Sequence, residues 1–123
     1  MPVIIASKQR YRGTVTPTDL NVETDVINLG DQGDDYIVEG YIDLSQLQDG
    51  ECVVIKEYIA VDGQNQRSFI TAELCGVLED PVIRFHSKEI PYDGKYRVTI
   101  TQKTGTVRSF PYVFIVMVQG TTE

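Results

Sequence analysis

The sequence predicts an all-β protein, an antiparallel β-sandwich of about eight strands and of jelly-roll or immunoglobulin-like type. Polar and apolar residues alternate with period two in several stretches, and the apolar positions are rich in β-branched and aromatic side chains. Turn dipeptides that contain glycine, most of them Asp-Gly, lie between these stretches at close spacing. Short strands joined by such turns are typical of two sheets packed face to face.

The alternation also locates the strands. In 51–61, the side chains of Val53, Ile55 and Ile59 share one side, and Glu57 interrupts that apolar side with a carboxylate. Period two puts alternate side chains on opposite faces of a strand, so each such stretch predicts one buried and one exposed face. We expect strands at residues 9–16, 22–28, 35–44, 51–61, 67–74, 82–89, 95–103 and 106–118.

The region after residue 67 also fits a second interpretation. Ile70, Leu74, Val77 and Leu78 match the apolar stripe of a helix. Gly76 within that stripe, and the strand-rich segments on either side, favour a strand followed by a loop.

The last strand is apolar on both faces, since the run from Arg108 to Val118 has few polar residues. This indicates a central strand, or one covered by a neighbour. Pro111 cannot donate a ladder hydrogen bond, so it is expected at an edge, at a bulge or where the pairing of that strand starts.

A chain of 123 residues is one domain, and we divide it into an amino-terminal arm at 1–8, a sandwich at 9–119 and a tail at 120–123. We recognise no signal peptide, and no apolar run approaches the roughly 20 residues of a membrane span. These features predict a cytosolic setting. Cys52 and Cys75 are too few for a disulfide scaffold, and they either pair with each other or stay free and buried.

Charge is unevenly distributed along the chain, whose net charge is −7. Residues 13–55 contain ten acidic residues and no Lys or Arg, whereas basic residues dominate from Pro81 onward and in the first twelve residues. Either the two halves interleave in the folded protein, or they form an acidic and a basic face suited to contacts between copies. The acidic total argues against sequence-independent binding of nucleic acid.

The sequence contains few residues suited to catalysis or metal binding. His86 is the sole histidine and falls within an expected strand, where a structural role is favoured over a catalytic one. Asp31, Asp34 and Asp35 could offer oxygen ligands to calcium, but they lack the EF-hand spacing, so an ordinary turn is favoured. We therefore assign no catalytic, cofactor-binding or metal-binding residue, expect no cofactor, and predict that the protein is not an enzyme.

Four features resemble the small β-sandwich virion proteins of tailed phages and archaeal viruses, which act as capsid, decoration or other structural components. They are a short basic arm from Met1 to Arg12, a compact body of strands and turns, the stretch from Tyr41 to Gly50, and the stretch from Thr104 to Tyr112. The resemblance implies a non-catalytic part that repeats many times on a particle.

We therefore expect a structural or assembly protein, a virion component that contacts itself and other virion proteins and no nucleic acid or membrane. Such a protein would be found in the virion after assembly in the host cytoplasm, and otherwise in the cytoplasm. The alternative is a β-sandwich module that binds a carbohydrate, a peptide or a cell surface, with calcium at Asp31, Asp34 and Asp35 as a further option.

Overall fold

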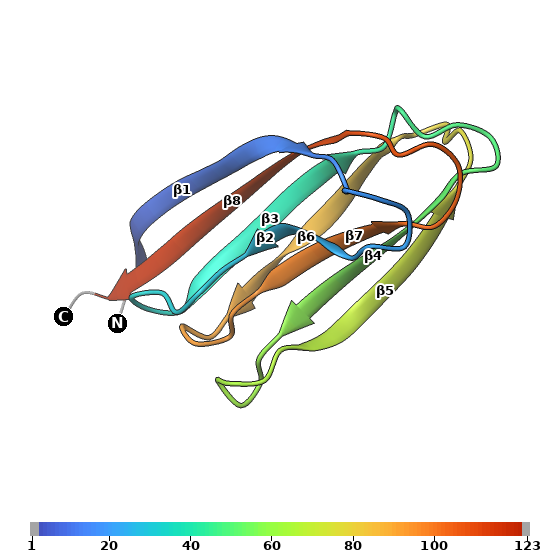
Figure 1. Cartoon of the computed structure of the whole chain (residues 1–123). Coiled ribbons are helices and arrows are strands. Elements are labelled where there is room, and N and C mark those ends of the chain that lie inside the picture. Colours follow the sequence, from blue (N-terminus) through green and yellow to red (C-terminus); the bar gives the residue numbers. More distant parts are fainter. Residues whose placement is uncertain (1–2, 122–123) are drawn as a thin grey trace.

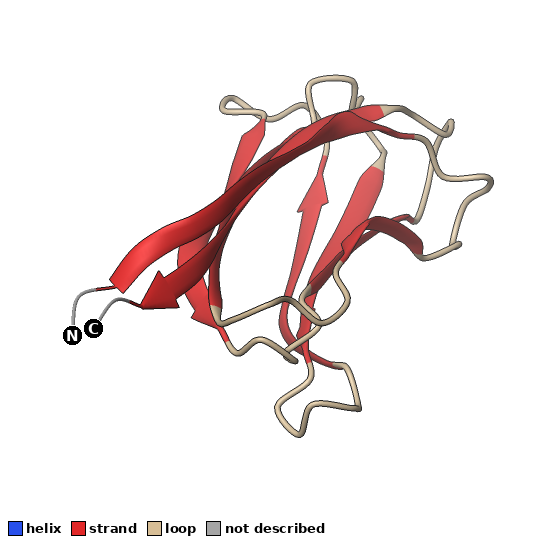
Figure 2. Ribbon diagram, turned by 90° about the vertical axis from the view of Figure 1, so that its left-hand side faces the viewer, coloured by secondary structure: helices blue, strands red, loops and turns tan. Residues whose placement is uncertain are grey.

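The computed structural model describes residues 3–121, and its eight strands confirm the all-β prediction (Figure 1). No helix occurs among these residues, and consequently none that could cross a membrane. Figure 2 shows two layers of strands, with the loops gathered mainly at their ends. The strands are β1 (Val3–Val15), β2 (Thr24–Asn28), β3 (Tyr36–Asp43), β4 (Cys52–Ile59), β5 (Arg67–Cys75), β6 (Val82–Ile90), β7 (Arg97–Gln102) and β8 (Phe110–Thr121).

The strands form two antiparallel four-stranded sheets. Sheet A has the order β1-β8-β3-β6, and sheet B has the order β2-β7-β4-β5. Consecutive strands pair directly only at β4 and β5, and every other connection passes from one sheet to the other. An immunoglobulin-like sandwich pairs its first two strands within one sheet, so this order rules out that type.

The structure bears on four expectations about particular segments. β1 begins at Val3 and not near residue 9, so residues 3–8, expected as an arm, continue the strand and pair with β8. Residues 1–2 lie outside the described residues, and so do residues 122–123 of the expected tail, whereas 120–121 belong to β8. Residues 67–75 are a strand and not a helix, and Pro111 lies at the start of a central strand, as predicted.

The core fills the space between the inner faces of the two sheets. In β8, Phe114 and its inward neighbours Val116 and Val118 are buried, as the alternation predicts. Gly40 lies opposite Phe114 on β3, and a Cβ atom there would come within 2.1 Å of the Phe114 ring. The absence of a side chain at Gly40 therefore makes room for Phe114, whose ring centroid lies 5.1 Å from that of Phe85. The Phe114 ring on β8 thus fills the space that Gly40 leaves on the neighbouring strand β3.

Each of the four edge strands carries an irregularity in register. The extra residue is Ala6 in β1, Val26 in β2, Phe69 in β5, and one of the pair His86 and Ser87 in β6. The central pairings of β3 with β8 and of β4 with β7 have no such shift. Bulges twist an edge away from regular pairing, and so hinder the addition of a further strand.

Cys52 and Cys75 form a disulfide, which the sequence left undecided. They lie directly opposite each other on β4 and β5, with their Cα atoms 4.1 Å apart. Antiparallel pairing brings opposite Cα atoms within disulfide reach without any movement of the backbone. The bond ties the exposed edge strand β5 to the central strand β4.

We predict that reducing this disulfide, or replacing both cysteines by serine, lowers the free energy of unfolding by about 3 kcal/mol, as expected for a closed loop of this size. The sequence separation is 23 residues, so the bond restricts the unfolded chain appreciably. Urea unfolding with and without reductant measures the change. Equal midpoints, or two titratable thiols in the untreated native protein, would contradict the prediction.

Candidate functional site

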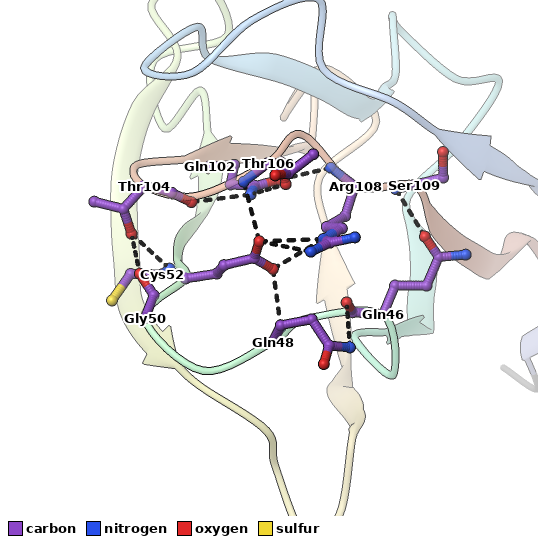
Figure 3. Close-up of polar contacts among 10 residues, drawn as sticks. Gln46, Gln48, Gly50, Cys52, Gln102, Thr104, Thr106, Arg108 and Ser109 are labelled. Carbon is purple, nitrogen blue, oxygen red and sulfur yellow. Dashed lines mark hydrogen bonds and ion pairs between the residues drawn. The ribbon is translucent and has the colours of Figure 1, made fainter.

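A buried carboxylate joins two loops at one end of the sandwich (Figure 3). Glu51 is only 4% exposed, and its Oε1 and Oε2 atoms accept hydrogen bonds of 2.9 Å each from Nε and Nη2 of Arg108. The backbone N–H groups of Gln48 and Thr106 donate to the same carboxylate at 2.9 and 3.0 Å. The Arg108 guanidinium, with these backbone donors, lowers the pKa of Glu51 from 4.5 to about 2, although burial acts in the opposite direction.

The surrounding polar groups are satisfied as well. Gln102 is fully buried, and its Nε2 atom donates to the carbonyl oxygens of Thr104 and Thr106 at 3.0 and 2.7 Å. Its Oε1 atom accepts from the backbone N–H of Arg108 at 2.9 Å (Figure 3). Gly105 has a φ of +88°, and a Cβ atom there would collide with the side chain of Glu51. Because protein groups occupy both carboxylate oxygens, this cluster holds the loops together and leaves no free base or metal ligand.

We predict that the stability contributed by Glu51 is present above about pH 4.5 and is lost as the pH falls toward about 2. The sign follows because the folded-state pKa is lowered, so the unfolded chain binds the proton more readily in this range. Thermal unfolding of the wild type and of Glu51→Gln should therefore differ at pH 7 and converge in acid.

Asp62, whose pKa is also lowered to about 2 by hydrogen bonds from Asn65 and from the backbone of Gln64, is present in both proteins and cancels in this comparison. A difference between the two proteins that stays constant down to pH 2 would contradict the role of Glu51.

Glu57, which interrupts the apolar side of its strand, has a partner from the other sheet. It is 5% exposed, its Oε1 atom lies 2.9 Å from Nζ of Lys88 on β6, and it accepts a hydrogen bond from the hydroxyl of the buried Tyr96. Lys88 Nζ also lies 5.3 Å from the Tyr96 ring centroid and donates to the carbonyl oxygen of His86 at 2.6 Å. Burial, and then Glu57, raise the pKa of Tyr96 above its ordinary value. The cluster links β4 of sheet B, and the residue that directly precedes β7, to β6 of sheet A.

This cluster lies at a groove of about 230 Å³ between β5 and β6, on one open side of the sandwich. The groove is lined mainly by apolar side chains, and the residues flanking it lie on two bulged edge strands. Apolar lining residues are Ile55, Ile70, Ala72, Leu74, Ile83 and Phe85.

Replacing Lys88 by Met should lower the free energy of unfolding by about 3 kcal/mol, because it leaves the buried carboxylate of Glu57 without its cation. The double variant Lys88→Met, Glu57→Gln should lose less, since the amide carbonyl still accepts from Tyr96 and no buried charge remains. Urea unfolding of the two variants makes the comparison. A double variant less stable than the single one would show that the ion pair is not the source of the loss.

The two other candidates from the sequence do not form a site in the structure. His86 lies on the bulge of β6 with an exposed side chain. In the acidic loop, Asp31 pairs with Lys95 at 2.9 Å, while Asp35 accepts the backbone N–H of Tyr92 at 2.9 Å. Asp34 accepts the backbone N–H of Asp35, and no group of three or more metal-ligand side chains forms within the described part of the chain.

The ion pairs decide between the two charge interpretations. Asp25 pairs with Arg97, and Glu51 pairs with Arg108, as Asp31 does with Lys95. Each pair joins the acidic stretch to the basic second half, so the two halves interleave in space.

The outer face of sheet A, in contrast, is partly apolar. On the central strand β8, the outward side chains Val113, Ile115 and Met117 form a half-exposed column. On β3 the outward Tyr41 is 40% exposed. Solvated outer faces of sandwiches normally carry polar residues, so an apolar column there is unusual. We call this surface, made of the outward side chains of β1, β8, β3 and β6, the A face.

Charged residues flank the column on both sides. Lys8, Arg10 and Arg12 project from β1 on one side, and within residues 3–121 none of them forms an ion pair. Glu39 and Asp43 lie on β3 on the other side and likewise make no ion pair in this part of the chain. The charges on this face are thus available to a partner.

The A face is hollowed at one end. An open hollow of about 450 Å³ lies among residues that include Arg12, Tyr41, Val82 and Pro111. The sequence analysis did not predict this surface, because the surface depends on which strands become neighbours. The one signal for it in the sequence was the apolar character of both faces of 108–118.

The outer face of sheet B is polar in comparison. Arg97 bonds to Asp25 at 2.7 Å and lies 5.0 Å from the ring centroid of Tyr58, measured from its guanidinium carbon. Glu23 accepts hydrogen bonds from Tyr58 and from Thr99. Arg97, Asp25 and Glu23 thus have partners in their own chain, whereas Arg67 and Glu73 on the edge strand β5 form no ion pair within residues 3–121.

No protein-family model matches the sequence, and no curated protein matches it. Among solved structures, the chain is similar to the crystal structure of the infectious bursal disease virus VP2 subviral particle, with 14% sequence identity and a TM-score of 0.47. The match covers 95% of this chain and 32% of that chain, so this chain spans about one third of its length. A likeness of this strength identifies neither a family nor a function.

Proposed function

We propose that this chain is a non-catalytic assembly protein of a virion, as a capsid, decoration or tail-associated component. It acts through contacts with copies of itself and with other virion proteins. The observation that carries the proposal is the A face, where an apolar column lies between basic and acidic side chains that form no ion pair within residues 3–121. Exposed apolar surface that is contiguous and rimmed by polar groups is typical of protein–protein interaction sites.

The chemistry of the interior supports a role without catalysis. The two buried carboxylates, Glu51 and Glu57, are both held by cations and hydrogen-bond donors of their own chain. A general base or a nucleophile needs a side chain free to meet a substrate, in a pocket that can orient it. Among the described residues, the buried carboxylates are instead bound to other groups of the chain, and the A face offers a broad surface.

The assignment to a virion draws on the resemblance to small virion β-sandwich proteins, and two further features are in keeping with it. We propose that the fold is a jelly roll, since it has eight strands in two sheets and all but one of its connections cross between them. The disulfide is in keeping with a finished particle outside the reducing cytosol, after assembly in the host cytoplasm. Nucleic acid and membranes are not proposed partners, because the chain carries a net charge of −7.

A second candidate function is the binding of a carbohydrate, a peptide or a cell surface. The hollow on the A face favours it, because Tyr41, Val82 and Pro111 offer an aromatic and apolar lining beside the charged Arg12 and Asp43. A calcium-assisted version through Asp31, Asp34 and Asp35 lacks support, since all three carboxylates are engaged within the loop region.

We expect the purified chain to form a defined oligomer whose dissociation constant rises as salt is increased from about 0.01 M to about 1 M, because salt screens exposed charges. Light scattering at several protein concentrations measures the mass. A monomer at every concentration and every salt level would contradict the assembly proposal and leave the ligand-binding module as the better hypothesis.

A further inference from the structure

We infer that this chain forms a twofold homodimer in which two A faces pack together about an axis nearly parallel to β8. The inference rests on the proposed function and specifies its partner, a second copy of this chain, and the surface used. It follows from the order in which charged and apolar side chains cross the A face.

The register of sheet A arranges these side chains in straight rows. Arg10, Ile115 and Glu39 are direct neighbours across β1, β8 and β3. Each row therefore runs from a basic residue on β1, through an apolar residue on β8, to an acidic, aromatic or apolar residue on β3. The rows beside it are Arg12, Val113 and Tyr41 on one side, and Lys8, Met117 and Ile37 on the other.

A twofold axis along β8 makes this pattern complementary to itself. The rotation keeps the position along the strand and exchanges the two sides, so β1 of one copy lies over β3 of the other. Arg10 then faces the partner subunit's Glu39, and Ile115 faces the partner subunit's Ile115 on the axis. Arg12 comes to lie over Tyr41 and near Asp43 of the partner subunit, at the hollow, where a guanidinium can pack on an aromatic ring.

The same charges exclude the alternative dimer, in which the twofold axis also lies in the plane of the interface but runs across the strands. An axis across the strands would place β1 over β1, and would oppose three basic side chains of each copy with no acid between them. Like charges at close range in an interface are strongly unfavourable, so this packing is disfavoured. Facing sheets pack with their strands about 30° apart, so the axis is tilted by about 15° from β8 and bisects the angle between the two copies of that strand.

The geometry also explains why Arg10 and Glu39 do not pair with each other within residues 3–121 of one chain. Two strand spacings of about 4.8 Å separate β1 from β3, and Ile115 stands between the two side chains. They meet an opposite charge only across the interface. Strand addition at an edge is the competing mode, and the bulges in all four edge strands hinder it.

The test is a charge exchange on the A face, read out as the dimer dissociation constant by analytical ultracentrifugation. Arg10→Glu and Glu39→Arg should each raise the constant about tenfold or more, because each substitution creates two like-charge contacts about the axis. The double variant Arg10→Glu, Glu39→Arg should restore it to within about threefold of the wild type. Arg67→Glu and Glu73→Arg, exposed on β5 of sheet B, are the matched controls and should leave it unchanged.

A second measurement does not depend on the charges. Ile115→Cys should be joined to its copy in the partner subunit by a short thiol-reactive bifunctional reagent, because the two copies of residue 115 face each other on the axis across sheets packed about 10 Å apart. Thr101→Cys, half-buried on the outer face of the central strand β7, is its control and should stay monomeric on a non-reducing gel. Circular dichroism of each variant checks that the fold is retained.

The outcomes separate this inference from the proposed function. A wild-type dimer that the charge exchange does not affect, and that Ile115→Cys does not cross-link, overturns the A-face arrangement but keeps the assembly role. A wild type that is monomeric at all concentrations overturns both. Loss of dimer in the single variants without recovery in the double variant overturns the pairing of Arg10 with Glu39.

Discussion

The burial of one apolar face from each of two sheets is the interaction on which the rest of the structure depends. Residues that alternate along the strands bring their apolar halves together, and Phe114 occupies the centre because Gly40 on the neighbouring strand leaves room for its ring. A core of this kind fixes the register of every strand, since a slip of one residue would turn its apolar side chains to solvent. Once the register is fixed, the positions of all outward side chains follow.

Two acidic residues are exceptions to the apolar interior, and both have structural partners. Glu57 ties the two sheets together through Lys88 and Tyr96, while Glu51 ties two loops together through Arg108. Buried charges are tolerated when they are paired and hydrogen-bonded, and this condition is met at both places. Their carboxylates are consequently unavailable for chemistry, which shifts attention from the interior to the outer faces.

The two outer faces differ most at their central strands, where β8 carries an apolar column on the A face and β7 carries polar residues on sheet B. On sheet B, Asp25, Arg97 and Glu23 are engaged with neighbours in the same chain, whereas on the A face the charged residues flank an apolar column and have no ion-pair partner within residues 3–121. The bulged edges hinder lateral growth of the sheets. A protein with blunted edges and one partly apolar face is suited to packing face to face.

The sequence by itself determined the eight strands and their inward residues, because period two and the glycine turns are local properties of the chain. It also marked Glu57 as anomalous and indicated that the last strand would be central. Only the tertiary structure decided the strand order, the pairing of Cys52 with Cys75, and the start of β1 at Val3. The row of Arg10, Ile115 and Glu39 brings together residues from three distant segments. Such neighbours depend on non-local strand pairing, which local periodicity does not encode, and the A face could therefore be recognised only in the folded chain.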